Sequence, residues 1–211
     1  MADIINFMTY RKHRKIRRLR NVPKPVQQGK RRRIKPKRQG DLDGLCGVYS
    51  IINAMCAVYK RKKIDKYRLF KHLLLTLEKD TTVTAAILDG TYKKHLNNMM
   101  ETAVAYVGKK HGARITINPL FKHNSNISLK SYWKTLQEFL SKSKRRCVIV
   151  GYRGKHDHWT VIYDVTNDAL KLLDSGGTKR IRRHSCQVGK PYTDKYYHLI
   201  PSQVWGISLK D

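Results

Sequence analysis

The chain has 211 residues and a formal net charge of +30, because 45 lysines and arginines stand against only 15 acidic residues. Hydrophobic residues make up 40% of it, which is enough for one compact core, and the composition excludes collagen-like, wholly disordered and disulfide-rich classes. The longest apolar stretch, residues 45–59, is too short to cross a bilayer, and the first residues do not resemble a secretion signal. With four scattered cysteines and no C-x-x-C pair, we expect a reduced intracellular protein, cytoplasmic or, in a eukaryotic source, nuclear.

The positive charge is concentrated near the N-terminus. Residues 1–40 contain 15 basic residues and one acid, in two clusters separated by a proline- and glycine-containing linker. We therefore expect a basic arm over 1–40 and one folded domain over 41–211. Such arms bind nucleic acid or other polyanions without sequence preference, although a solubilising tail or a nuclear address would also explain the charge. The residues expected to contact a polyanion are Arg11, Arg14, Lys15, Arg17, Arg18, Arg31, Arg32 and Arg33.

The domain begins with helical patterns. Residues 45–59 are apolar on nearly all sides, which predicts a buried helix. An amphipathic helix follows in the segment 65–77, where we expect a buried stripe formed by Tyr67, Phe70, Leu73, Leu74 and Leu77. The patterns further along predict a helix over 92–110, a short strand over 113–120 and a helix over 128–141 that Ser128 caps.

The second half of the domain reads as strands. Four strand-like segments are predicted, at 147–153, 158–165, 169–175 and 198–209. Helices that precede a group of strands are typical of an α+β fold.

Cys46 is the cysteine with a setting for chemistry. An acidic, glycine-containing turn delivers it to the first turn of the predicted buried helix, where the positive end of the helix dipole favours a thiolate. Gly44 and Gly47 are expected to leave room for a substrate backbone. The sequence thus makes Cys46 the candidate nucleophile.

The other three cysteines lack this setting. Cys56 and Cys147 lie in apolar segments and are expected to be core thiols, whereas Cys186 lies in a basic segment and is expected to be exposed. A zinc site would have to combine ligands as scattered as Cys147, His156, His158 and Cys186, so we expect no metal and no cofactor.

A histidine and an aspartate are expected to meet across a hairpin. His158 opens one predicted strand and Asp174 closes the next. They share a face if Asp174 pairs with His158 or with Thr160, whereas a register shifted by one residue separates them unless a bulge intervenes. Trp159 should then point to the opposite face. His156 has the same parity but lies further out, in the loop before the strand.

The order Cys46, His158, Asp174 resembles the papain-like cysteine peptidase clan. The motifs that carry the resemblance are LDGLCGVYSIINA, HDHWTVIYDV and LKLLDSGG, and the bacteriocin-processing and related bacterial branches look most similar. In layout the resemblance covers residues 39–209. It implies a helical N-terminal lobe that carries the nucleophile and a C-terminal antiparallel sheet that carries the base. Cys46 would attack an acyl carbon, His158 would move the proton and Asp174 would orient the imidazole.

The resemblance also implies an oxyanion hole. The family places a glutamine six residues before the cysteine, whereas Gln39 lies seven residues before Cys46. Gln39 can still supply the hole together with the backbone N–H of Cys46, but Asp41 or Asp43 could occupy the place instead. An ionised carboxylate would repel an oxyanion, and would favour acyl transfer, deamidation or an inactive site.

The expected function is an intracellular cysteine peptidase that hydrolyses peptide or isopeptide bonds in a protein or peptide substrate. Its basic arm would hold it near nucleic acid, an acidic partner or a membrane surface. One alternative keeps the triad and changes the reaction to acyl transfer or glutamine deamidation. Another is a polyanion-binding protein that uses the papain-like scaffold without catalysis.

Overall fold

The fold is that of a computed structural model, which describes residues 35–40, 43–59, 63–121, 126–154, 157–189 and 194–210. All of them belong to one compact unit within residues 32–211. The arm residues expected to contact a polyanion lie outside the described residues, as do Asp41 and His156.

Five α-helices occur in the described part of the chain. They are α1 (Cys46–Val58), α2 (Lys66–Leu77), α3 (Val83–Asp89), α4 (Lys93–His111) and α5 (Leu129–Ser141). Side chains cap three of them, because Asp65, Thr82 and Ser128 each accept a hydrogen bond from a backbone N–H in the first turn of α2, α3 and α5 respectively. The predictions for α1, α2, α4 and α5 are confirmed, and α3, which has only seven residues, was not predicted. None of these helices, within the ranges described, is long and apolar enough to cross a bilayer.

The described strands form a single sheet. They are β1 (Ile115–Pro119), β2 (Arg146–Gly154), β3 (His158–Val165), β4 (Ala169–Leu172), β5 (Arg180–Arg182), β6 (Cys186–Val188) and β7 (Tyr197–Leu209). The strand order is β1-β7-β2-β3-β4-β5, and every neighbouring pair along this path is antiparallel. The short strand β6 adds to β7 in parallel. The fold is thus mixed helix and antiparallel sheet, as the α+β prediction requires.

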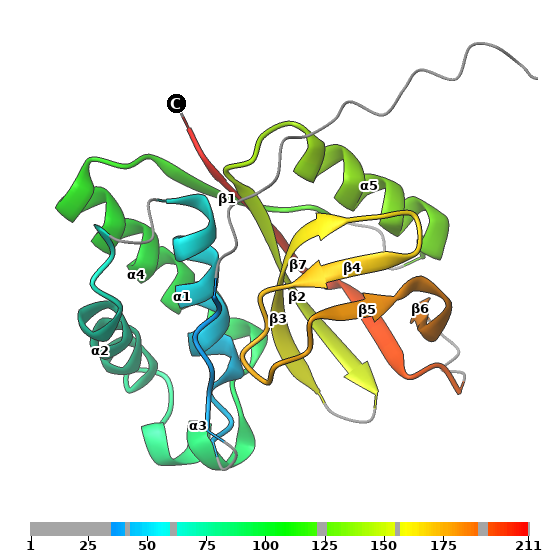
Figure 1. Ribbon diagram of the computed structural model, residues 1–211. Coiled ribbons are helices and arrows are strands. Elements are labelled where there is room, and N and C mark those ends of the chain that lie inside the picture. Colours follow the sequence, from blue (N-terminus) through cyan, green and yellow to red (C-terminus); the bar gives the residue numbers. More distant parts are fainter. Residues whose placement is uncertain are drawn as a thin grey trace, which may run out of the picture. The chain divides into compact units, whose positions relative to one another are not determined.

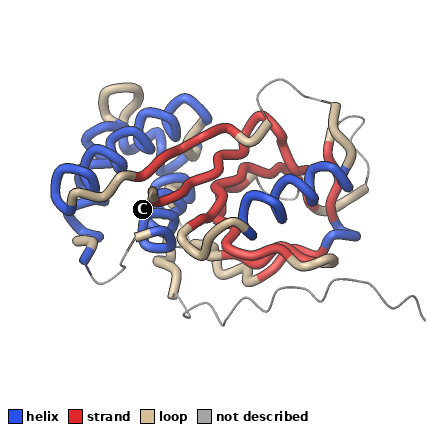
Figure 2. Tube along the Cα trace, turned by 90° about the horizontal axis from the view of Figure 1, so that it is seen from above, coloured by secondary structure: helices blue, strands red, loops and turns tan. Residues whose placement is uncertain are grey.

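Helices cover both faces of the sheet (Figures 1 and 2). On one face α1 packs against β2 and β3, and α2 and α4 pack on the outside of α1. On the other face α5 covers β2 and β3. Because α1 lies between the outer helices and the sheet, only Tyr49 and Ala57 in it are partly exposed, which is the burial that its apolar sequence predicts.

Two expectations about burial differ from the structure in part. The fully buried residues of α2 are Leu69, Leu73 and Leu77. Phe70 and Leu74 are partly buried against the same core, whereas Tyr67 is 82% exposed. An i, i+4, i+8 row is as consistent with the helical period as the predicted one, and packing against α4 selects it. Cys186 is also buried, because it lies in β6 beneath the α5 face of the sheet rather than in an exposed loop.

Candidate active site

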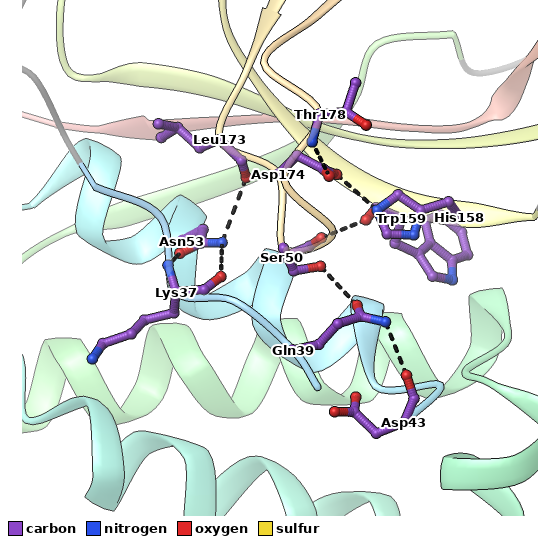
Figure 3. A network of polar contacts seen from close by, with 11 residues as sticks. Lys37, Gln39, Asp43, Ser50, Asn53, His158, Trp159, Leu173, Asp174 and Thr178 are labelled. Carbon is purple, nitrogen blue, oxygen red and sulfur yellow. Dashed lines mark hydrogen bonds and ion pairs between the residues drawn. The ribbon is translucent and has the colours of Figure 1, made fainter. Parts of the chain in front are cut away.

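His158 and Asp174 are joined by a hydrogen bond across the β3–β4 hairpin. His158 is the first residue of β3, and Asp174 follows β4 by two residues. The His158 Nε2 atom lies 2.7 Å from Asp174 Oδ1 (Figure 3). The predicted pair of side chains is therefore brought together.

A β-bulge sets the register that allows this pairing. Close to the turn Asp164 pairs with Lys171, whereas beyond the bulge Ile162 pairs with Leu172. The Leu173 N–H then donates to the Val161 carbonyl at 2.8 Å, which continues the second register toward the site. Without this bulge the register near the turn would put the two side chains on opposite faces.

The Asp174 carboxylate is buried, and both of its oxygens have hydrogen-bond partners. Its side chain is 2% exposed, and its Oδ2 atom accepts the Thr178 N–H at 3.0 Å, while Oδ1 faces His158. Burial by itself would raise the pKa of Asp174, but the hydrogen bond and charge of His158, together with the Thr178 N–H, lower it below its ordinary value. Asp174 is accordingly held as a carboxylate that orients the imidazole.

Cys46 is the thiol that acts on this imidazole. It is the first residue of α1, and its interaction with His158 contributes to the raised pKa of that histidine. Because Nε2 faces Asp174, Nδ1 is the ring nitrogen that remains for the thiol. Burial would lower the pKa of His158, but its bonds to Asp174 and Cys46 and their charges raise it to about 9. At neutral pH the imidazolium thus lies between a carboxylate and the sulfur, a setting in which thiols are reactive.

Helix α1 also carries two buried polar residues that fix the backbone next to this pair. Ser50 Oγ donates to the Trp159 carbonyl at 2.8 Å, and Asn53 Nδ2 lies 3.5 Å from the Leu173 carbonyl (Figure 3). With Cys46 they occupy positions i, i+4 and i+7, so all three share one helix face. The sequence analysis did not assign Ser50 or Asn53 to the site. The signal for them was their polarity within an otherwise apolar helix.

The segment 37–40 runs along the site as an extended strap. Both backbone groups of Lys37 bond the Asn53 side chain, with Lys37 N–H to Asn53 Oδ1 at 2.7 Å and Asn53 Nδ2 to the Lys37 carbonyl at 3.1 Å. Gln39 bonds Ser175 through its backbone N–H and through its side-chain oxygen, which accepts the Ser175 hydroxyl at 2.8 Å. These residues, which the sequence analysis placed in the arm, are attached to the folded domain.

The Gln39 amide reaches the loop that precedes Cys46. Its Nε2 atom donates to the Asp43 carbonyl at 2.9 Å, so one of its two hydrogens remains for another acceptor. The Asp43 carboxylate is engaged within the loop, where it accepts the N–H groups of Gly40 at 2.6 Å and Leu45 at 3.1 Å. Of the two side chains, Gln39 and Asp43, only the neutral amide of Gln39 has a hydrogen to donate.

Gly44 and Gly47 have a different role from the expected one. The Gly44 N–H donates to the Ile87 carbonyl at 2.7 Å, and a Cβ there would lie 2.8 Å from that oxygen. A Cβ on Gly47 would collide with the Thr91 hydroxyl. The two glycines let the start of α1 pack against α3 and the α3–α4 connection, so the expectation that they make room for substrate is wrong.

One aromatic ring lies next to His158, and the tryptophan that follows it in β3 is buried on the other face. Trp159 is buried on the helical face, where its indole N–H donates to the Thr91 carbonyl at 2.7 Å, as the alternation along β3 predicts. The Tyr152 ring lies 5.6 Å from the His158 ring, and burial, then the charge of Asp174, raises the pKa of Tyr152. Tyr152 is therefore a neutral wall of the site rather than a second base.

The two cysteines considered for zinc lie in different parts of the core. Cys147 packs in the core between the sheet and the helical layer, whereas Cys186 packs in the core beneath α5. Across the described residues there is no cluster of three or more side chains that could hold a metal ion.

Comparison with known proteins gives no family for this chain. No family model matches it, and no curated protein is detectably similar to it in sequence. The assignment of function therefore depends on the chemistry of the side chains described above.

Proposed function

We propose that the protein is a papain-like cysteine peptidase that hydrolyses peptide or isopeptide bonds. The observation that carries this proposal is that His158 hydrogen-bonds a buried carboxylate through Nε2 and that Cys46, the first residue of α1, interacts with the same imidazole closely enough to raise its pKa. Such an arrangement of nucleophile, base and orienting acid activates a thiol toward acyl carbons. The α+β fold, with the cysteine on a buried helix and the base on an antiparallel sheet, is consistent with the resemblance stated above.

The groups are arranged to carry one balanced reaction. In the resting pair the thiol proton is already on His158, as an imidazolium beside the Cys46 thiolate, and this thiolate adds to the carbonyl carbon of the substrate. His158 then gives that proton to the departing amine as the C–N bond breaks, which leaves a thioester on Cys46. Water attacks the thioester while His158 accepts its proton, and the acid and the free thiol are released. Asp174 stabilises the imidazolium throughout.

Neutral donors near the sulfur support hydrolysis of a neutral amide. The backbone N–H of Cys46, at the first turn of α1, has no acceptor within the helix. The second amide hydrogen of Gln39 can complete an oxyanion hole with it. Losing one such donor typically costs about 10²–10³ in turnover. We expect the Gln39→Ala variant to lose turnover by this order while Cys46 remains alkylatable.

A peptide library tests the reaction. The full chain is incubated with a proteome-derived peptide library, and new termini are identified by mass spectrometry. We expect new termini with the parent protein and none with Cys46→Ala. Cys56→Ala is the matched control, because Cys56 is a second buried thiol of α1 that lies near the other end of the helix. Loss of ammonia without chain cleavage would indicate a deamidase, and amine incorporation a transferase. If the library were unchanged in every respect, the peptidase assignment would be wrong.

A further inference from the structure

A groove of about 650 Å³ lies between α2 and α4, on the part of the helical layer that faces away from the sheet. Side chains from both helices line it. The ones that bear on its chemistry are Arg68, His72, Thr102, Tyr106, Lys109 and Lys110.

The groove is remote from the candidate active site. Tyr59, just after the end of α1, stacks on His111 at the end of α4, with ring centroids 5.3 Å apart. The end of the groove that carries Lys109 and Lys110 therefore lies near the C-terminal end of α1, whereas Cys46 is at the N-terminal end of that helix. A helix of 13 residues is about 20 Å long, so a ligand in the groove does not touch the Cys46 thiol.

The two walls of the groove present like charges to each other. Arg68 on α2 faces Lys109 and Lys110 on α4, and all three are exposed. Among the described residues none of the three forms an ion pair with a carboxylate. Asp65, which caps α2, interacts with two of them, because the Arg68 N–H, followed by the charges of Lys110 and Arg68, lowers its pKa. The three cations are thus only partly balanced, and an anion between the walls would relieve their repulsion.

A phenol group completes this surface. The Tyr106 ring lies 5.2 Å from the His72 ring and 5.7 Å below Lys110 Nζ. The Tyr106 hydroxyl accepts from Lys110 Nζ at 3.4 Å, so its own hydrogen remains available to an incoming oxygen.

We propose that this groove binds the phosphodiester backbone of a single-stranded nucleic acid. Arginine, lysine and tyrosine are side chains that contact phosphate oxygens, and the fork of Arg68 fits a phosphate through two parallel bonds. The charge of the whole chain, +30, favours a polyanion over a small anion. The exposed ring of His72, which lies beside Tyr106, adds a surface on which a base can stack. The site is additional to the proposed peptidase site and does not depend on it.

The test measures how salt weakens binding of the full chain to a fluorescent single-stranded oligonucleotide. The groove variant is Arg68→Gln, Lys109→Gln, Lys110→Gln. The matched control is Lys130→Gln, Lys142→Gln, Lys144→Gln, which removes the same charge from exposed positions on or near α5. The arm contributes equally in both proteins, so the difference isolates the groove. Loss of three phosphate contacts should reduce the slope of log K against log salt by about 2 in the groove variant alone.

Two results would overturn the proposal. Equal slopes for the groove variant and the control would show that the groove makes no phosphate contact. If an oligoglutamate of matched charge bound with the same dependence on the groove, the partner would be an acidic protein instead. Thermal unfolding of both variants checks that they are folded, and Tyr106→Phe should weaken binding while leaving the slope unchanged.

Discussion

The Ser50 hydroxyl on α1 donates to the backbone carbonyl of Trp159, so the helix that carries the nucleophile is attached to the residue next to the base. This bond is buried and joins positions 109 residues apart in the chain. It fixes the position of β3, and with it His158, relative to the start of α1, because both ends of the bond belong to regular secondary structure. The distance between thiol and imidazole is thereby built into the packing of α1 on β3.

Replacing Ser50 by alanine should loosen this attachment. The Trp159 carbonyl would lose its partner in a buried place, which costs about 1–3 kcal/mol of unfolding free energy. We also expect slower alkylation of Cys46, measured by peptide mapping after an iodoacetamide pulse. Ser208→Ala is the control, since it removes a similar hydrogen bond, to Thr116 on β1, far from the site. Equal loss of Cys46 reactivity in both variants would contradict a positioning role for Ser50.

Cys46 should be the first thiol to react with sub-stoichiometric iodoacetamide. It is the cysteine nearest an imidazolium, and it is slightly more exposed than the other three, at 7%. Burial raises the pKa of Cys186 to about 12, an effect that Lys195 only partly opposes, so Cys186 should label slowly. Preferential labelling of Cys56 or Cys147 would remove Cys46 from the role of nucleophile.

The loss of turnover caused by a substitution in the triad should reflect the role of the residue that is replaced. We expect His158→Ala to abolish turnover, and Asp174→Asn to reduce it substantially, given that general-base contributions are about 10²–10⁴-fold. His156→Ala should be tolerated, because the hydrogen bond to Asp174 belongs to His158. The measurement is the rate at which a peptide from the library is cleaved. If His156→Ala lost activity while His158→Ala retained it, the base would be His156, and the assignment of His158 would be wrong.

The raised pKa of His158 predicts a pH-dependent stability. Its pKa is about 9 in the folded protein against an ordinary value of 6.5, so folding favours its protonated form. The resulting stability, about 3 kcal/mol, is fully present below pH 6.5 and is lost as the pH rises through about 9. Urea unfolding of the parent and of His158→Gln should therefore converge over this window. His184→Gln, at an exposed histidine, should run parallel to the parent.

Removal of the arm should weaken binding to nucleic acid of every sequence and reduce its salt dependence. The deletion should end at residue 34, because Lys37 and Gln39 are bonded to the domain. We expect the shortened protein to keep the thermal stability of the parent, while deletion through Gln39 should lower it. Equal affinity before and after removal of residues 1–34 would make the folded domain, with its α2–α4 groove, the whole binding site.

Local patterns predicted much of this molecule. Alternation along β3 was enough to put His158 and Trp159 on opposite faces, and the apolar sequence of α1 indicated its burial. Helix α3 is too short to show a recognisable helical pattern in the sequence. Strands β5 and β6 have three residues each, and they are strands only because neighbouring strands pair with them. Their signals come from tertiary contacts, which a pattern along the chain does not contain.

The candidate site divides in the same way. His158 and Asp174 could be paired from the sequence because a hairpin leaves few registers, although the bulge that selects the right one is not visible in it. The bonds of Ser50 and Asn53 were missed because their partners are backbone groups of other segments, two of them carbonyls more than 100 residues away. The sequence analysis expected Gly44 and Gly47 to leave room for a substrate because it did not predict α3, the helix that packs on Gly44.

The strap at 37–40 gives the chain before it a fixed attachment point. Lys37 is bonded to Asn53, whose side chain also lies 3.5 Å from the carbonyl of Leu173, the residue before Asp174. We therefore expect a polyanion bound by the basic residues that precede Lys37 to stay near the candidate site, and any protein bound to the same polyanion to share that volume. The encounter of such a protein with Cys46 would then be governed by effective concentration rather than by its concentration in the cell. Lengthening the chain between residues 34 and 37 with glycine and serine should lower the rate for polyanion-bound substrates and leave the rate for free peptides unchanged.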